Sequence, residues 1–195
     1  MFNRKIPIFN SRIIVSMKQL NTALIVLLLF VVSVNLQAQP KPYKATTVQI
    51  AALKHQADEM CTALVKQNYQ KIAYYTAPQI MKAVGGKEKM VESIKQSMVK
   101  IQSHGVAFVS LATGDIKDIY RSKGDLYSIV PDVMQFSANG TVITRGAYLL
   151  AVSYNNGARW YFTDTAAFKL QDVKKKFPTY PDGLVIPEAG NGPGM

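Results

Sequence analysis

Two Asn-Gly dipeptides constrain the fold of this chain more than any other feature. Asn139-Gly140 and Asn156-Gly157 lie within residues 125–165, and each separates two runs rich in Val, Ile, Tyr and Phe. A type I′ hairpin turn needs a positive φ angle at both central residues, and Asn followed by Gly adopts these angles readily. Two such turns in series predict three antiparallel strands that follow one another as a meander.

The sequence before the meander has a helical period. Apolar residues recur every three or four positions after Thr46-Thr47, which predicts a helix of about 20 residues that ends near Asn68. Further helices are expected at residues 69–75, 78–84 and 87–103. Helices followed by a curling antiparallel sheet give an α+β fold in which the helices pack on one face of the sheet.

The period changes from 3.6 to 2 at Val106, where the first strand is expected to run to Thr113. A second strand is predicted at residues 116–121, before the three strands of the meander. Pro131 predicts a bulge or an edge position in the third strand, because proline has no N–H for the ladder. Gly146 predicts a bend or a bulge in the fourth strand, residues 141–154.

The N-terminal 38 residues have the pattern of a secretory signal peptide. Basic residues precede the apolar run at residues 23–34, and Ala38 offers a small residue at the expected cleavage point. The run is short for a membrane-spanning helix, although an uncleaved anchor is the alternative. Met17 is a possible true start, since Lys18 and the apolar run follow it. We therefore expect an exported chain that does not contact a membrane after cleavage.

The remaining 157 residues suit one domain. We expect a linker at 39–45, an α+β domain at 46–168 and a Pro/Gly-rich tail at 169–195. Cys61 is the only cysteine, so no intramolecular disulfide can form, and export without disulfides fits a bacterial periplasm or secretion. No cysteine follows the apolar run directly, which argues against a lipoprotein.

Residues 48–165 resemble the NTF2-like superfamily, whose cystatin-like α+β fold is shaped as a cone. The resemblance rests on the long first helix, the segment Asn68-Tyr69-Gln70-Lys71-Ile72-Ala73-Tyr74-Tyr75-Thr76, the Gly85-Gly86 break and the closing strand Arg159-Trp160-Tyr161-Phe162-Thr163-Asp164-Thr165. It implies a pocket between the first helix and the concave sheet face. The superfamily includes dehydratases, ketosteroid isomerases and many non-enzymatic binding or dimerisation domains, so the resemblance does not fix an activity.

The expected pocket is apolar and aromatic. In a regular closing strand, Trp160, Phe162 and Asp164 share one face. Asp164 is a weak catalytic candidate, because an acid among apolar side chains can have a raised pKa and act as a general base. An ordinary filled core is the competing interpretation. The residues expected to line the pocket are Tyr74, Tyr75, Tyr148, Leu150, Trp160, Phe162 and Asp164.

Several functional classes lack their motifs. The two histidines, His55 and His104, and Cys61 do not have the spacing of metal ligands, so no metal and no cofactor are expected. Phosphate-binding glycine loops and the G-x-S-x-G motif are absent from the sequence. Basic residues are scattered among acids, which argues against a nucleic-acid partner although the net charge is +11.

The sequence favours a non-enzymatic exported domain that binds a small apolar ligand or a protein partner, such as a second copy in a homodimer. One alternative is a lyase or isomerase that uses a pocket acid and a tyrosine. The other is a structural or dimerisation domain with a filled core. An open pocket with several polar groups would favour the enzyme, an apolar pocket with few would favour binding, and no pocket would favour the structural domain.

Overall fold

A computed structural model describes residues 40–167 and 169–188. The predicted signal peptide, the Met17 start and residues 189–195 lie outside this part of the chain. Four helices come first, α2 (Thr47–Val65), α3 (Tyr69–Tyr75), α4 (Pro78–Ala83) and α5 (Lys87–Ser103). Within the described residues, no helix combines the length and the apolar character that crossing a membrane requires.

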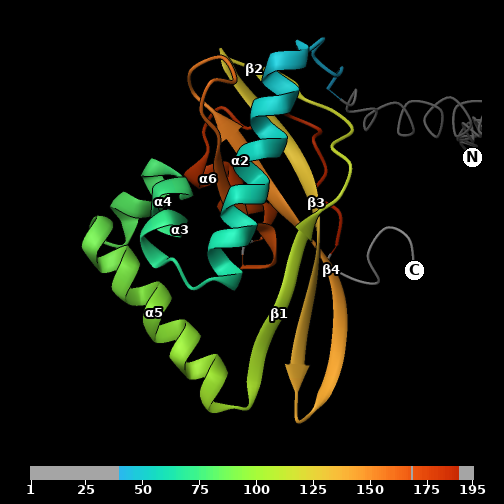
Figure 1. Cartoon of the computed structure of the whole chain (residues 1–195). Helices are drawn as coiled ribbons and strands as arrows, with labels where there is room; N and C mark the ends of the chain where they lie inside the picture. The colour runs from blue at the N-terminus through green and yellow to red at the C-terminus, as the bar shows by residue number, and fades with distance from the viewer. Residues whose placement is uncertain (1–39, 168, 189–195) are drawn as a thin grey trace, which may run out of the picture. The chain divides into compact units, whose positions relative to one another are not determined.

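The helices are followed by one antiparallel sheet, which curls into a half-barrel. Its strands are β1 (Val106–Thr113), β2 (Tyr120–Ser122), β3 (Asp125–Ala138), β4 (Thr141–Ser153) and β5 (Tyr161–Asp164). The order across the sheet is β1-β3-β4-β5, and β2 pairs with β3 beyond the end of β1. The predicted α+β class is therefore confirmed, with helices before a curled sheet (Figure 1).

Helix α2 begins directly after Thr46, where its sequence predicts the start, and the structure shows a capping box there. Thr46 is the N-cap, its hydroxyl accepts from the Gln49 backbone N–H at 3.2 Å, and the Gln49 side chain accepts from the Thr46 N–H at 2.8 Å. Two orphan N–H groups of the first turn are satisfied in this way. The Gln49 amide also donates to the backbone carbonyl of Asn156 at 2.9 Å, which ties the start of α2 to the loop before β5.

The first Asn-Gly turn forms as predicted, and the second does not. Asn139 and Gly140 have φ angles of 49° and 79° and connect β3 to β4 directly, as in a type I′ hairpin. Asn156 and Gly157 also have positive φ angles, yet β4 ends at Ser153 and β5 begins at Tyr161, so the predicted two-residue turn is wrong. Local hydrogen bonds hold the longer loop, because the Ser153 hydroxyl accepts from the Gly157 N–H at 2.9 Å.

The strand details also differ from the prediction in places. Strand β2 is only Tyr120–Ser122. Pro131 keeps regular register with β4, so the predicted bulge is wrong. Its strand is interior and not an edge strand, but Pro131 lies in the gap between the ends of β1 and β2, where its missing N–H interrupts no ladder and its carbonyl accepts from the Gly114 N–H at 2.8 Å. The register of β3 with β4 also continues through Gly146, so no bulge forms there, and the register shift lies in β1 between Phe108 and Ser110.

The sheet has a separate apolar core on each face. Side chains of β3 and β4 alternate between the two faces, so Leu126 and Leu149 belong to one core and Tyr127 and Leu150 to the other. We call the first the α2-side core: Leu53, Ala57, Cys61, Tyr75, Ile119, Leu126, Val130, Leu149, Ala151, Trp160 and Phe162. We call the second the C-terminal core: Ala77, Tyr127, Leu150, Val152, Val173, Phe177, Tyr180 and Leu184.

The C-terminal core contains a helix that the sequence pattern does not indicate. Helix α6 (Leu170–Lys176) lies behind the sheet in Figure 1, on the face opposite α2. Val173 and Phe177 are buried against Tyr127 and Leu150, and Leu184 follows them into the same core. The described part of the predicted tail is thus packed against the sheet.

Candidate functional site

A cavity of about 170 Å³ lies between α2 and the sheet. From α2 it is lined by Met60, Cys61 and Leu64, and the opposite wall comes from four strands. The strand residues are Leu111, Asp132, Met134, Ala147, Leu149 and Asp164. The wall is apolar apart from one thiol and two carboxyl groups, as expected for a small-molecule site in which few polar groups fix the ligand.

Asp132 is the most unusual residue of the cavity. It lies in β3, opposite Ala147 of β4 and Thr113 of β1, and only 2 % of its surface is exposed. Its Oδ1 atom is buried and has no hydrogen-bond partner. Burial, followed by the nearby charge of Asp164, raises the pKa of this carboxyl to about 6. A buried polar atom without a partner in a cavity is a position where a ligand atom can bind.

Asp164 forms the second carboxyl group of the cavity. It ends β5 opposite Leu149 and is exposed, so the cavity reaches solvent on this side. Its Oδ1 atom accepts from the Ala166 N–H at 2.9 Å, which caps the turn into the 3₁₀-helix η2 (Thr165–Ala167). The sequence prediction of an acid beside apolar side chains therefore applies to two residues, of which Asp132 is the deeper.

Cys61 lines the same cavity without being activated. Burial, and then the charges of Asp132 and Asp58, raise the pKa of its thiol to about 12. The thiol is therefore protonated at neutral pH, whereas a nucleophilic cysteine needs a lowered pKa. Cys61 acts here as a small apolar wall residue.

The structure does not bring all the predicted pocket residues together. Phe162 shares the α2-side face with Asp164 and is buried in the α2-side core, together with Trp160. Leu150 pairs with Thr163, so it points to the opposite face and belongs to the C-terminal core. Tyr148 lines a different cavity, of about 230 Å³, together with Tyr120, Pro131 and Leu184. Of the seven predicted residues, Asp164 alone lines the α2-side cavity.

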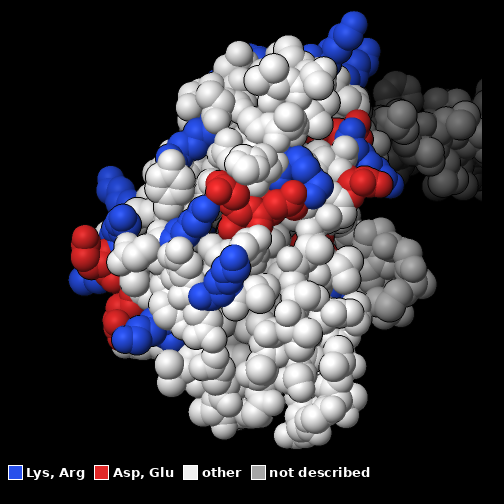
Figure 2. Space-filling view, viewed as in Figure 1, with Lys and Arg blue, Asp and Glu red and all other residues white. Residues whose placement is uncertain are grey.

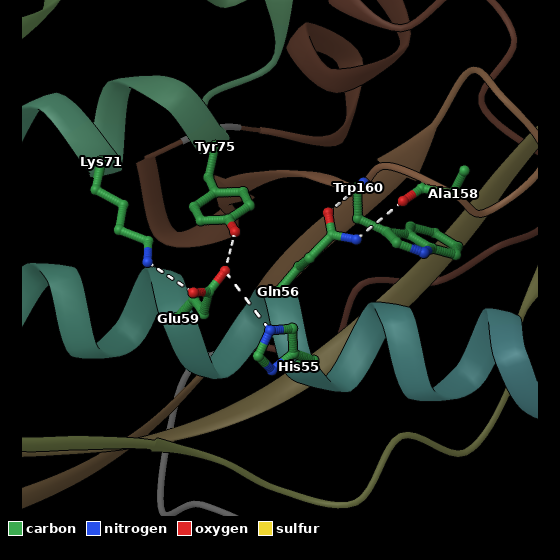
Figure 3. A network of polar contacts seen from close by, with 7 residues as sticks. All are labelled: His55, Gln56, Glu59, Lys71, Tyr75, Ala158 and Trp160. Carbon is green, nitrogen blue, oxygen red and sulfur yellow. Dashed lines mark hydrogen bonds and ion pairs between the residues drawn. The ribbon is translucent and has the colours of Figure 1, made fainter.

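The two tyrosines of α3 have different environments. The Tyr75 ring is buried in the α2-side core, and its hydroxyl donates to Glu59 of α2, to which Lys71 Nζ also donates at 2.7 Å (Figure 3). These two hydrogen bonds, that of Lys71 first, lower the pKa of the Glu59 carboxyl. Tyr74 is half exposed and carries the Arg159 guanidinium 3.6 Å above its ring centroid. Neither tyrosine lines the cavity.

Trp160 is held through its backbone by α2. Gln56 accepts from the Trp160 backbone N–H at 2.9 Å and donates to the Ala158 carbonyl at 3.1 Å, as Figure 3 shows. The indole is fully buried, and its Nε1 atom has no hydrogen-bond partner. This pair of bonds fixes the chain where it enters β5, the strand that carries Asp164.

Sequence analysis did not identify Asp132, although a weak signal for it exists. Val130, Asp132 and Met134 alternate along β3 with the period of one sheet face, so an acid interrupts an apolar series. Recognising it requires knowing that this face meets α2 rather than solvent. That information comes from the register with β4, and the local pattern does not contain it.

Among the described residues, no group of three or more His, Cys, Asp and Glu could hold a metal ion. No protein-family model and no curated protein matches the chain.

Proposed function

We propose that this chain is an exported, non-enzymatic domain of the NTF2-like type that binds a small, mainly apolar ligand between α2 and the curled sheet. The observation that carries the proposal is the 170 Å³ cavity whose apolar wall contains one buried carboxyl oxygen without a partner. An engineered apolar cavity of about 150 Å³ binds benzene, so a cavity of this size suits a ligand with about six to ten non-hydrogen atoms. Helices packed on a curled antiparallel sheet support the assignment to this fold type.

The proposal is tested by filling the cavity. Ala147→Leu adds three carbon atoms to the cavity wall, whereas Ala112→Leu makes the same change at an exposed position of β1. Titration of the full chain with benzyl alcohol, followed by amide NMR shifts, should move the signals of Leu64, Leu111 and Met134. The shifts should disappear in Ala147→Leu and persist in Ala112→Leu. Shifts that persist in both variants, or wild-type shifts elsewhere, would refute the proposed site.

A second candidate function follows from Asp132. A buried carboxyl with a pKa of about 6 in an apolar cavity has the properties of a general base for proton abstraction next to a carbonyl group. No tyrosine lines this cavity to stabilise the resulting enolate, which favours binding over isomerase or lyase chemistry. If the chain has this activity, cyclic ketones in D₂O should exchange their α-protons for deuterium faster with the wild-type chain than with Asp132→Asn. Equal rates would exclude this function for the ketones tested.

The distal part of the sheet supports a role in contact with a protein partner, and we propose a second copy of this chain. Val109, Val142 and Ile143 are exposed although they are apolar. On the face that Figure 2 shows, the lower part of the surface, over β1 and the β3–β4 hairpin, carries almost no charged side chains. Light scattering on the full chain should then give the mass of a dimer, and Val142→Lys should give the mass of a monomer. A wild-type monomer would remove this part of the proposal.

A further inference from the structure

The chemistry of the α2-side cavity indicates what kind of ligand it selects. Two carboxyl groups line it, that of Asp132, which is buried, and that of Asp164, which is exposed. No Lys, Arg or His is among the residues that line it. Ala147 and Leu149 of β4 lie between the two acids in the sheet, and the register pair Leu111 and Met134 continues the apolar wall beside Asp132 on the β1 side.

Asp132 is not neutralised from inside the protein. Lys54 of α2 binds Asp58 at 2.7 Å and Lys71 of α3 binds Glu59 at 2.7 Å, so each of these two cations is paired with another carboxylate. A buried carboxylate without a cation or hydrogen-bond donor is costly, and buried charges in proteins are normally paired. A ligand that brings a positive charge and N–H donors to Asp132 Oδ1 would remove this cost.

We propose that the α2-side cavity binds a small organic cation, with an ammonium group against Asp132 Oδ1 and an apolar body between Met60, Leu111 and Met134. This inference rests on the proposed binding function and names its ligand class. Asp164 increases the preference for a cation, because a second negative charge favours positive ligands and repels anions. A divalent metal ion is a poor occupant, because Ca²⁺ requires six to eight oxygen ligands and most of this wall is apolar.

The test uses three probes of nearly equal size and different charge. Benzylamine is cationic at neutral pH, benzyl alcohol is neutral and benzoate is anionic. Calorimetric titration of the full chain at pH 7.5 should give a dissociation constant for benzylamine about tenfold or more below that for benzyl alcohol, as expected for a charge-assisted hydrogen bond. Benzoate should not bind.

Variants that remove one carboxylate charge each show which carboxyl group causes the preference for benzylamine. Asp132→Asn keeps the shape of the side chain and should weaken benzylamine binding about tenfold while leaving benzyl alcohol within about threefold. Asp164→Asn should weaken benzylamine less, because its carboxylate is exposed to solvent. Asp182→Asn removes the same charge at a side chain that is 97 % exposed and should change neither constant.

The outcomes separate the two proposals. If benzyl alcohol binds as tightly as benzylamine, or if benzoate binds best, the cation inference is overturned and the cavity remains a binding site. If benzylamine binds and Asp132→Asn weakens it no more than Asp182→Asn does, the cation lies outside the cavity and the inference is again overturned. If none of the three probes binds, both the inference and the proposed binding function fail.

Discussion

The two faces of the sheet differ in how often their buried polar atoms have hydrogen-bond partners. In the C-terminal core, the Tyr180 hydroxyl donates to the Leu184 carbonyl at 2.9 Å, and Thr179 links the Tyr127 hydroxyl to Asp125. In the α2-side core and its cavity, Trp160 Nε1 and Asp132 Oδ1 have no partner. Thr163 Oγ1 is the exception on the C-terminal side. Similar strands therefore support a core with mostly paired hydroxyl groups on one face and a core with two unpaired polar atoms on the other.

The difference indicates which face is optimised for stability. A buried hydroxyl with a partner stabilises the fold modestly, whereas an orphan acceptor lowers stability and is retained only where something else requires it. The C-terminal core therefore stabilises the fold, whereas the unpaired carboxyl oxygen in the α2-side cavity lowers the free energy of unfolding. The experiments below test this contrast, from the largest expected effect to the smallest.

Phe177→Ala should lower the free energy of unfolding by about 3 kcal/mol, because it removes a buried ring from the C-terminal core. Urea denaturation followed by circular dichroism measures the change. The control is Leu170→Ala, at an exposed position of α6, the helix that ends just before Phe177. It should change the free energy of unfolding by less than about 0.5 kcal/mol. A loss below about 1 kcal/mol for Phe177→Ala would mean that α6 contributes little to the folded unit, and the contrast between two cores would fail.

Asp132→Asn should raise the free energy of unfolding by about 3 kcal/mol at pH 7. The folded-state pKa is raised from 3.8 to about 6, so the folded protein binds the proton more tightly than the unfolded chain. The stability of the wild type relative to the variant therefore falls as the pH rises from about 4 to 6 and then stays constant.

Urea midpoints at pH 4 and pH 7 measure this difference. The advantage of Asp132→Asn should shrink to about 0.5 kcal/mol at pH 4, where the carboxyl is protonated in the folded state and about half ionised in the unfolded chain. A variant that is less stable than the wild type at pH 7 would show that Asp132 has a favourable partner, and the cavity would lose its distinguishing feature.

Tyr180→Phe should lower the free energy of unfolding by about 1 kcal/mol, since it leaves the buried carbonyl of Leu184 without its donor. The sign is opposite to that for Asp132→Asn, although both changes remove a buried polar group. Thermal and urea unfolding at pH 7 should agree on this sign. If Tyr180→Phe is stabilising, hydrogen bonding does not distinguish the two faces.

Lys174→Met should have the smallest effect. It breaks an ion pair to Asp182 at 3.3 Å, and the Asp182 side chain is almost fully exposed, so solvent screens the interaction. No change in the urea midpoint should be resolved. A clear loss of stability would show that the lysines of α6 hold the C-terminal core in place, which the buried apolar contacts alone do not predict.

Much of the fold is determined by local sequence signals. The capping residue Thr46, the Gly85-Gly86 break and the Asn139-Gly140 turn each fix a boundary through backbone geometry, so they can be interpreted without tertiary information. The second Asn-Gly pair shows the limit of this approach. Its φ angles match the prediction, yet the Gln49 side chain from α2 binds the loop and a seven-residue connection replaces the tight turn.

The candidate site depends on non-local information. Asp132 and Leu150 cannot be assigned to a face until the register of β3 with β4 and of β4 with β5 is known, because a shift of one residue exchanges the two faces. Helix α6 has only a few apolar residues, and their burial depends on the sheet face behind them. The class of fold is therefore predictable from this sequence, and the cavity is not.

The position of the C-terminal core in the chain has a consequence for biosynthesis. The sheet is complete once Asp164 has been made, but four residues of the C-terminal core come later in the chain, namely Val173, Phe177, Tyr180 and Leu184. While the chain is being synthesised from its N-terminus, this core stays incomplete until residues 173–184 have emerged. The nascent domain therefore carries an incompletely covered apolar sheet face for a time, and a holding chaperone would find its binding surface there.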